Sequence, residues 1–408
     1  MEFRPFRALR PLPQYAAAIA SLPYDVVDED EARLEVRRRP LSFMHVERPE
    51  VDLPPGTDPH DPAVYRQARL NLDAYEERGL MAQDPHPMFY VYRQAMGERS
   101  QTGLVGLASV DEYLEGIIRR HELTRAEKEA DRVRHVDATD AHSSPVFLAY
   151  RHTDAVDAVV ARVTTGAPAY DFTTDDGVRH HLWLLDDPAD VERVRAGFAA
   201  LRHAYVADGH HRTASAARVA LLRRQRQGAG EHDLFMAVAF PDTELRILAY
   251  NRVVADLNGL SPQEFLARLG KAFEVTVTAA AARPAATHEF GMYLLGEWHR
   301  LVPRPGTWDE ADPVRALDVS ILQDLVLGPI LGIRDPRTDT RIDFIGGIRG
   351  PEELERRVDL GRDALAFALH PTSMDELMAI ADAGAIMPPK STWFEPKLRS
   401  GLFVHRLT

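Results

Sequence analysis

The chain has 408 residues with 62 acidic and 49 basic side chains, a formal net charge of −13 that argues against sequence-independent binding of nucleic acid. Its 45% apolar composition excludes global disorder, and the absence of cysteine excludes disulfides, thiolate metal sites, iron–sulfur clusters and cysteine nucleophiles. Because no apolar stretch approaches the ~18–20 residues that span a bilayer and the first residues lack a signal-peptide pattern, we expect a cytoplasmic protein with no membrane or nucleic-acid partner.

The first ninety or so residues are broken by prolines and predict an N-terminal α/β region over residues 1–95. Apolar spacing predicts an amphipathic helix from Pro62 to Gly79. A strand is predicted at 42–46, and strands at 89–93 and 102–109 are expected to form a hairpin joined by Gly97.

The middle block, residues 96–228, is predicted to be the core of the protein. Helices are expected over 124–136, 188–201 and 213–227, and strands over 146–151, 156–163, 181–185 and 204–206. The first of these helices is expected to begin at Thr124, since Thr124 and Glu127 have the spacing of a capping box. The sequence Gly228-Ala229-Gly230 is the best candidate for a linker.

A C-terminal α/β region that contributes a tail to the site is expected over residues 231–408. Strands are predicted over 234–240 and 246–253 and as a pair around 291–302, and helices near 318–331, 352–363 and 373–383. Ser261, with Glu264 three residues on, predicts a further helix that opens with a capping box. The succession of elements is typical of an α+β (mixed α/β) fold and not of a regular parallel βαβ series.

The strongest motif is a short apolar strand, 204–206, followed by Ala207-Asp208-Gly209-His210-His211-Arg212-Thr213. A strand, a glycine turn and a helix start make an anion site, because the first amides of a helix have no partner within it. Arg212 and a histidine can add charge-assisted bonds, and Thr213 is a plausible N-cap. The alternatives are a plain structural corner and a zinc site, although adjacent histidines rarely bind one ion together.

A second motif runs from His121 to Arg132. Arg125, Lys128 and Arg132 follow one another at i, i+3 and i+7, which predicts three cations on one helical face. Glu122 precedes the helix, on a loop where its carboxylate can face a site. The competing interpretation is a solvated, salt-bridged helix.

The third motif is Met387-Pro388-Pro389-Lys390-Ser391-Thr392-Trp393-Phe394-Glu395-Pro396-Lys397. Two prolines stiffen a loop that presents lysines, hydroxyls and aromatic rings, which suits the wall of a phosphate or carboxylate site; an ordinary C-terminal strap is the alternative. Only four lysines occur in the chain, Lys128, Lys271, Lys390 and Lys397, and three of them lie in these motifs.

Other signals are weaker. Ile345 to Gly350 could be a phosphate turn, although a plain tight turn is favoured, and Pro23-Tyr24-Asp25 could line a cleft. There is no Walker motif, no G-x-G-x-x-G and no protein-kinase signature, so the common nucleotide folds are not indicated.

The Asp208-Gly209-His210-His211-Arg212 turn resembles the phosphate-binding turn of the ParB/sulfiredoxin superfamily. Within it, the sequence is most similar to free serine kinases and to a longer family of about this length that pairs an ADGHHR core with an HE-x-TR-x-x-KE-x-DR segment and an MPPKSTWFEPK tail. All three motifs are present in that order, at 207–212, 121–132 and 387–397. Sulfiredoxin chemistry needs a cysteine, and ParB proteins carry a basic DNA-binding region; the chain has neither.

The resemblance implies a ParB/sulfiredoxin-like core and a kinase that converts free L-serine to O-phospho-L-serine. It implies Glu122 as general base, the 208–212 turn as phosphate site and Mg²⁺ as cofactor. The predicted site residues are Glu122, His211 and Asp208 for catalysis; Gly209, His210, His211, Arg212, Thr213, Arg125, Lys128, Arg132 and Lys390 for phosphate; Ser391, Thr392 and Trp393 for substrate; and Asp208 for the metal.

The longer family that the chain resembles includes pyrophosphate-dependent serine kinases. The phosphoryl donor is expected to be pyrophosphate, with ADP or ATP next, because the cationic motifs also suit a polyanion and no adenine-site motif is recognisable. The alternative is a non-catalytic ParB-like module that senses a nucleotide. A sensor does not need a carboxylate beside a phosphate turn, so the position of Glu122 relative to residues 208–212 distinguishes the two.

Overall fold

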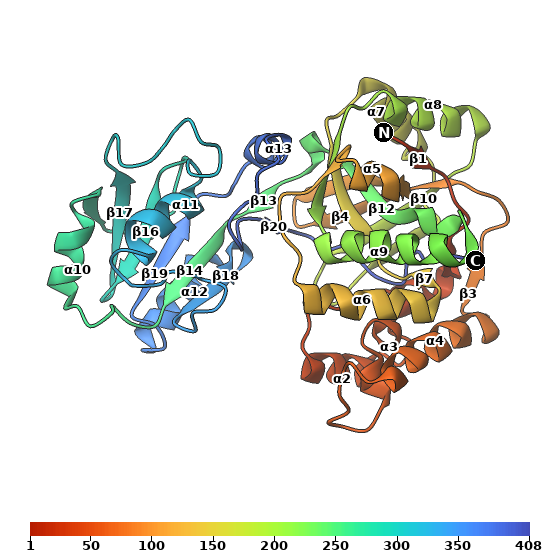
Figure 1. Cartoon of the computed structure of the whole chain (residues 1–408), viewed down its shortest axis with the longest axis horizontal. Helices are drawn as coiled ribbons and strands as arrows, with labels where there is room; N and C mark the ends of the chain where they lie inside the picture. The colour runs from red at the N-terminus through yellow and green to blue at the C-terminus, as the bar shows by residue number, and fades with distance from the viewer. The chain divides into compact units, whose positions relative to one another are not determined.

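The computed structural model describes residues 1–408, which form two compact units. Unit 1 consists of Met1–Leu245 together with Pro396–Thr408, and unit 2 of Arg246–Glu395 (Figure 1). Both units combine helices and sheets, which confirms the predicted mixed α/β class. None of the helices has the length and apolar character needed to cross a membrane.

Unit 1 is built on a nine-stranded sheet with the order β6-β11-β8-β12-β5-β4-β10-β9, in which β1 also pairs with β5. Its strands are β1 (Phe3–Arg4), β4 (Phe89–Met96), β5 (Arg99–Ser109), β6 (Ile118–Arg119), β8 (Val146–Tyr150), β9 (Tyr170–Thr173), β10 (Arg179–Leu185), β11 (Ala204–Asp208) and β12 (Leu234–Pro241). The central strands β8 and β12 are parallel and wholly buried, which explains their continuous apolar sequences.

Helices and two small strand pairs complete unit 1. The helices are α1 (Ala16–Ile19), α2 (Glu29–Arg38), α3 (Met44–Glu47), α4 (Pro62–Glu77), α5 (Val110–Leu114), α6 (Ala126–Thr139), α7 (Asp154–Val163), α8 (Pro188–Ala199) and α9 (His210–Gln227). β2 (Leu9–Pro11) pairs with β3 (Met81–Gln83), and β7 (Ala141–His142) with β21 (His405–Arg406). α6 packs against α9 on one side and α4 on the other (Figure 1).

Unit 2 contains an antiparallel six-stranded sheet of the order β15-β17-β16-β19-β14-β18. Its elements are β13 (Ile247–Leu248), β14 (Tyr250–Val254), α10 (Pro262–Leu269), β15 (Phe273–Thr278), β16 (Phe290–Leu294), β17 (Glu297–Pro303), α11 (Asp318–Leu322), β18 (Ile342–Gly346), α12 (Gly350–Asp359), β19 (Leu365–Leu369), α13 (Met374–Asp382) and β20 (Trp393–Phe394), which pairs with β13. The Ser261–Glu264 capping box opens α10 as predicted.

Two predicted strands are helices. Residues 156–163 lie in α7, because Thr153 caps the amide of Val156 and the buried valines Val156 and Val159 are three positions apart, a helical spacing. Residues 42–46 run into α3, and Phe43, which precedes the helix, is buried three positions before Val46 within it.

The compact units differ from the three expected regions. The expected boundary between residues 95 and 96 falls inside the β4–β5 pair, and Gly228 to Gly230 joins α9 to β12 within unit 1. A break in local composition cannot reveal strands that pair across it in one sheet, nor a C-terminal segment that returns to the first unit.

Candidate functional site

The segment at residues 204–213 forms the predicted strand, turn and helix. The register of β11 against β8 shifts between Val206 and Asp208, an irregularity that changes the direction of the Asp208 side chain at the strand end. Gly209 follows with a φ of 90°, and α9 begins at the next residue. A Cβ at Gly209 would lie 3.4 Å from Nη1 of Arg212, an ordinary contact, so the backbone conformation and not the space favours glycine.

Helix α9 begins three residues earlier than predicted, so Thr213 is not the N-cap. Gly209 occupies that position, without a side-chain cap. The Thr213 amide and hydroxyl both donate to the Gly209 carbonyl oxygen, at 3.0 and 3.1 Å, and Thr213 is fully buried. The amides of His210, His211 and Arg212 therefore form the end of the helix, where a backbone N–H group attracts an anion. Thr213 holds the turn instead of facing a ligand.

Asp208 is fixed by two contacts. Its Oδ1 accepts the Gly209 amide at 2.7 Å, and its Oδ2 accepts Nζ of Lys397 at 3.0 Å. Burial by itself would raise the pKa of the Asp208 carboxyl, but the charges of Lys397 and Arg212 and the two hydrogen bonds hold that pKa below its ordinary value. Asp208 is therefore ionised at neutral pH and is neutralised locally by the lysine.

His210 points into the protein. Its ring meets the His121 ring edge-on, with centroids 4.5 Å apart, and both side chains are buried. Burial lowers the pKa of His121 to about 4 and that of His210 well below its ordinary value. Both rings are therefore neutral at pH 7, and His210 can contribute to an anion site through its backbone amide.

His211 joins the N-terminus of α9 to that of α6. Its Nε2 accepts the Arg125 amide at 3.0 Å, so the ring proton lies on Nδ1. Burial, with the nearby charges of Lys128 and Arg125, lowers the pKa of His211 and keeps it neutral. Arg125 is the N-cap of α6; the predicted capping box is not formed, because the Thr124 hydroxyl donates to Glu129 instead. The two helix starts thus converge.

Glu122 lies beside the turn. Its Oε2 is 3.9 Å from Nδ1 of His210, and 49% of its side chain is exposed. The segment before α6 therefore brings a solvent-accessible carboxylate to the N-terminus of α9. Glu122 therefore lies near the 208–212 turn, as expected, and its role as a base stays a prediction.

Arg212 is held by groups distant in the sequence. Its Nη1 donates to the Pro145 carbonyl oxygen at 2.6 Å, and its Nη2 is 3.6 Å from Oδ1 of Asp25. Burial by itself would lower the pKa of the Arg212 guanidinium. The negative charges of Asp25 and Asp208 have the larger effect and raise that pKa. The weak Pro23-Tyr24-Asp25 signal thus marks a segment that reaches the site.

Arg132 is on the inner side of α6. Its guanidinium donates to Oδ2 of Asp131 through Nε and Nη2, at 2.9 and 2.7 Å, and lies over the Tyr24 ring, 4.0 Å from its centroid. His60 and Tyr65 also contact Asp131. Arg132 is therefore engaged in a structural network, unlike the exposed Arg125 and Lys128.

A cavity of about 30 Å³ lies behind the turn, lined among others by Arg132, Arg212, Tyr24 and Glu47. This volume is close to that of one water molecule and is far below the ~300 Å³ of a typical ligand pocket. The cavity belongs to the packing beneath the site and is too small to be the substrate pocket.

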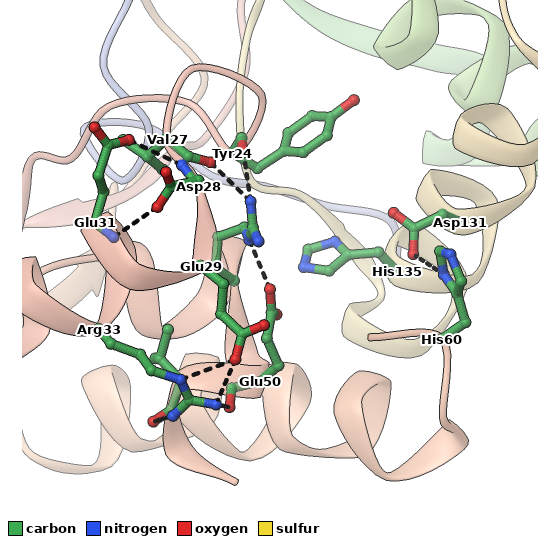
Figure 2. Close-up of polar contacts among 12 residues, drawn as sticks. Tyr24, Val27, Asp28, Glu29, Glu31, Arg33, Glu50, His60, Asp131 and His135 are labelled. Carbon is green, nitrogen blue, oxygen red and sulfur yellow. Dashed lines mark hydrogen bonds and ion pairs between the residues drawn. The ribbon is translucent and has the colours of Figure 1, made fainter. Parts of the chain in front are cut away.

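Arg48 fixes the segment that carries Tyr24 and Asp25; its partners Tyr24, Val27 and Glu50 are labelled in Figure 2. Arg48 donates to the carbonyl oxygens of Tyr24 and Val27, at 3.3 and 2.8 Å. It also donates to the Glu50 carboxylate at 2.6 Å. The contacts hold Tyr24 against Arg132 and Asp25 near Arg212.

Lys390, Ser391, Thr392 and Trp393 belong to unit 2. The Lys390 carbonyl oxygen accepts Nη2 of Arg252 at 2.9 Å, and its ammonium lies 5.5 Å from the Tyr250 ring centroid. The Ser391 hydroxyl donates to the Pro388 carbonyl at 2.6 Å. Their assignment to the phosphate and the substrate stays a prediction.

The sequence analysis does not assign Pro145 or Lys397 to the site, and it names Asp25 only within a segment that could line a cleft. Lys397 was noted as the second lysine of the tail, but was not assigned to the site. The scarcity of lysine was the available signal. Pro145 acts through its carbonyl oxygen, which no side-chain pattern could have shown.

Residues 3–320 match a family described as "Protein of unknown function (DUF1015)". The chain belongs to this family. The match runs through all of the turn and of the His121–Arg132 segment, and ends before the Met387–Lys397 tail. No curated protein matches the chain.

Among solved structures, the chain is similar to a free serine kinase in complex with AMP, with 15% identity over 73% of this chain and 90% of that chain, at a TM-score of 0.36. A conserved hypothetical protein from Pyrococcus furiosus has 14% identity over 73% and 94%, at 0.35. The C-terminally truncated SbnI from Staphylococcus aureus has 13% identity over 74% and 87%, at 0.37. These TM-scores are too low to assign an activity, or the ParB/sulfiredoxin-like core, to this chain.

Proposed function

We propose that this protein is a small-molecule kinase that transfers a phosphoryl group to the hydroxyl of free L-serine. The observation that carries the proposal is the Glu122 carboxylate, 3.9 Å from His210 at the glycine turn that begins α9. An anion site and a candidate base within reach of one another are what phosphoryl transfer to an alcohol requires. The family resemblance carried by the three sequence motifs implies serine as the acceptor.

In the proposed reaction, the serine hydroxyl oxygen attacks the terminal phosphorus of the donor. The bond from that phosphorus to the leaving oxygen breaks, and Glu122 accepts the hydroxyl proton. Because Glu122 is half exposed, it can meet a small substrate that enters from solvent. A positioned base of this kind contributes roughly 10²–10⁴-fold to the rate.

The donor phosphates are assigned to the two converging helix starts. The amides at the start of α9 and the Nδ1–H group of His211 supply hydrogen-bond donors. Arg125 and Lys128 supply positive charge beside His211. Arg132 is left out of this set because Asp131 and Tyr24 already engage it. Phosphoryl transfer depends mainly on such positioning and charge stabilisation.

Asp208 fits the predicted role toward Mg²⁺, directly or through water. Magnesium takes one or two protein carboxylates and fills its remaining positions with water and substrate phosphate. Each Asp208 oxygen has a lone pair beyond the one used with Gly209 or Lys397. When bound, the ion would neutralise charge on the donor; the residues described above bind and orient the reactants and move the proton.

Pyrophosphate is the proposed donor, with ADP and ATP next. Residues at the turn supply charge and amides, which suffice for an inorganic polyanion, whereas a nucleotide needs an apolar slot for its base. Lys390, Ser391, Thr392 and Trp393 are retained as proposed ligands of the phosphate and of serine.

The test is a ³¹P NMR assay of the purified protein with L-serine and Mg²⁺, and with pyrophosphate, ADP or ATP in separate tubes. We expect phosphoserine with pyrophosphate. Glu122→Gln should lower turnover by roughly 10²–10⁴-fold without changing the unfolding transition. The matched control is Glu127→Gln, since Glu127 lies in the first turn of α6 with 84% of its side chain exposed. Absence of phosphoserine in every tube would contradict the proposal.

A further inference from the structure

The C-terminal segment Pro396–Thr408 is built into unit 1. Its strand β21 pairs with β7, and Ser400 exchanges backbone hydrogen bonds with Ser21. The side chains of Leu402, Phe403 and Val404 are buried. The segment therefore occupies a fixed place in the same unit as the turn.

Two buried glutamines hold the start of this segment. Gln94 on β4 donates to the Lys397 carbonyl oxygen at 2.9 Å. Gln101, its cross-strand partner on β5, donates to the Pro396 carbonyl oxygen at 3.2 Å and to Gln94 Oε1 at 3.0 Å. Because buried amides without partners are costly, this pair favours one position for the Lys397 backbone.

That position brings the Lys397 ammonium to the turn. Nζ lies 3.0 Å from Oδ2 of Asp208, with 16% of the lysine and 29% of the aspartate side chain exposed. Asp208 precedes Gly209, and its carboxylate would repel a polyanion arriving at the start of α9. The ammonium cancels that charge where the donor is expected.

We propose that Lys397 is a positioning residue of the anion site, which acts by neutralising Asp208 so that the N-terminus of α9 can accept pyrophosphate. The choice of pyrophosphate rests on the proposed function, whereas the pairing of charges does not. The C-terminal segment thus contributes to the site through a lysine that the first two motifs do not contain.

Replacement of Lys397 by methionine leaves the Asp208 carboxylate beside the anion without its ammonium partner, with only the charge of Arg212, which also faces Asp25, to offset it. One like charge at this range should weaken pyrophosphate binding by at least about tenfold. Asp208→Asn combined with Lys397→Met removes both charges and should recover most of the lost affinity. Lys397→Arg keeps the charge and should bind more tightly than Lys397→Met.

The experiment measures inorganic pyrophosphate binding to the full-length protein by calorimetry without divalent cations, so that loss of the proposed Mg²⁺ ligand Asp208 does not enter the comparison, and folding is checked by urea unfolding. Lys271→Met, at an exposed lysine of unit 2, is the control and should bind as the wild type does. Should Lys397→Met fail to fold, Lys397→Gln, alone and with Asp208→Asn, carries the same comparison.

The inference is overturned if the wild type does not bind pyrophosphate, if the lysine variant binds within twofold of it, or if the double variant binds no better than the single one. Phosphoserine formation is measured in parallel. Charge-dependent binding without phosphoserine from any donor would refute the proposed function alone. Phosphoserine formation with unchanged binding in Lys397→Met would refute this inference alone.

Discussion

At residue 209 the backbone turns from β11 into α9 with a φ of 90°, a backbone conformation that residues other than glycine rarely adopt. The same turn sets the direction of three neighbours. The Asp208 carboxylate accepts the Gly209 amide, and the His210 ring packs against His121 in the interior. The Arg212 side chain lies close to Gly209 and donates to the Pro145 carbonyl oxygen. The conformation of one residue thus determines which groups face the anion site.

Gly209→Ala should therefore affect both stability and binding. The left-handed conformation should cost about 1–2 kcal/mol of the free energy of unfolding, and relaxation of that strain would displace the first amides of α9 and weaken pyrophosphate binding. Gly116→Ala is a matched control, because Gly116 has a φ of 79° and open space around it. Urea unfolding should show similar losses in the two variants, and calorimetry should show weaker binding only in Gly209→Ala. Equal binding in both would refute this role of Gly209.

At the scale of elements, the site is the meeting of two helix starts. α6 packs against α9, and the bond from the Arg125 amide to His211 joins their N-termini. The positive ends of both helix dipoles then act on the same region. Along α6 the cations have different surroundings: Lys128 is exposed near His211, whereas Arg132 is bonded to Asp131 beneath Tyr24.

Arg132→Met should therefore mainly lower stability, whereas Lys128→Met should mainly weaken pyrophosphate binding. Removal of Arg132 leaves Asp131 without its cation and should lower the free energy of unfolding by about 3 kcal/mol, with little change in pyrophosphate affinity of the folded protein. Removal of Lys128 should weaken binding several-fold and leave stability nearly unchanged. Urea unfolding and calorimetry on both variants provide the measurement. If folded Arg132→Met binds pyrophosphate more weakly than the wild type, Arg132 must be counted among the residues that bind the donor phosphates.

At the scale of the whole molecule, buried histidines set the response to acid. Burial lowers the pKa of each of five of them, His121, His135, His142, His180 and His210. In the unfolded chain these imidazoles have an ordinary pKa of about 6.5. Below that pH the unfolded state binds more protons than the folded state, so stability must fall as pH falls.

The free energy of unfolding should therefore be lower at about pH 5 than at about pH 7. His121, with a folded-state pKa of about 4, should account for about 2 kcal/mol of that decrease. Urea unfolding at the two pH values measures the difference, and His121→Phe should reduce it. A protein equally stable at both pH values would show that these rings are not neutral and buried.

Features whose causes are local were predictable from the sequence. The α4 helix, the β4–β5 hairpin around Gly97, the capping box of α10 and the strand–turn–helix at residues 204–213 follow from residues a few positions apart. Local pattern failed where β-branched residues suggested a strand, as at α7, because a cap and a buried helical face outweighed that preference. Capping was misread at Thr124 and Thr213, where other hydroxyl contacts prevail.

The sequence by itself determined which residue types could form an anion site, and the resemblance singled out Glu122 and the 208–212 turn. Only the tertiary structure decided which of them meet. In the folded chain Glu122 lies beside His210, and Arg132 donates to Asp131. Lys397 contacts Asp208, which is 189 positions away in the sequence. Such contacts depend on how strands pair and helices pack over the whole unit, because burial and charge compensation are satisfied jointly by residues distant in the chain.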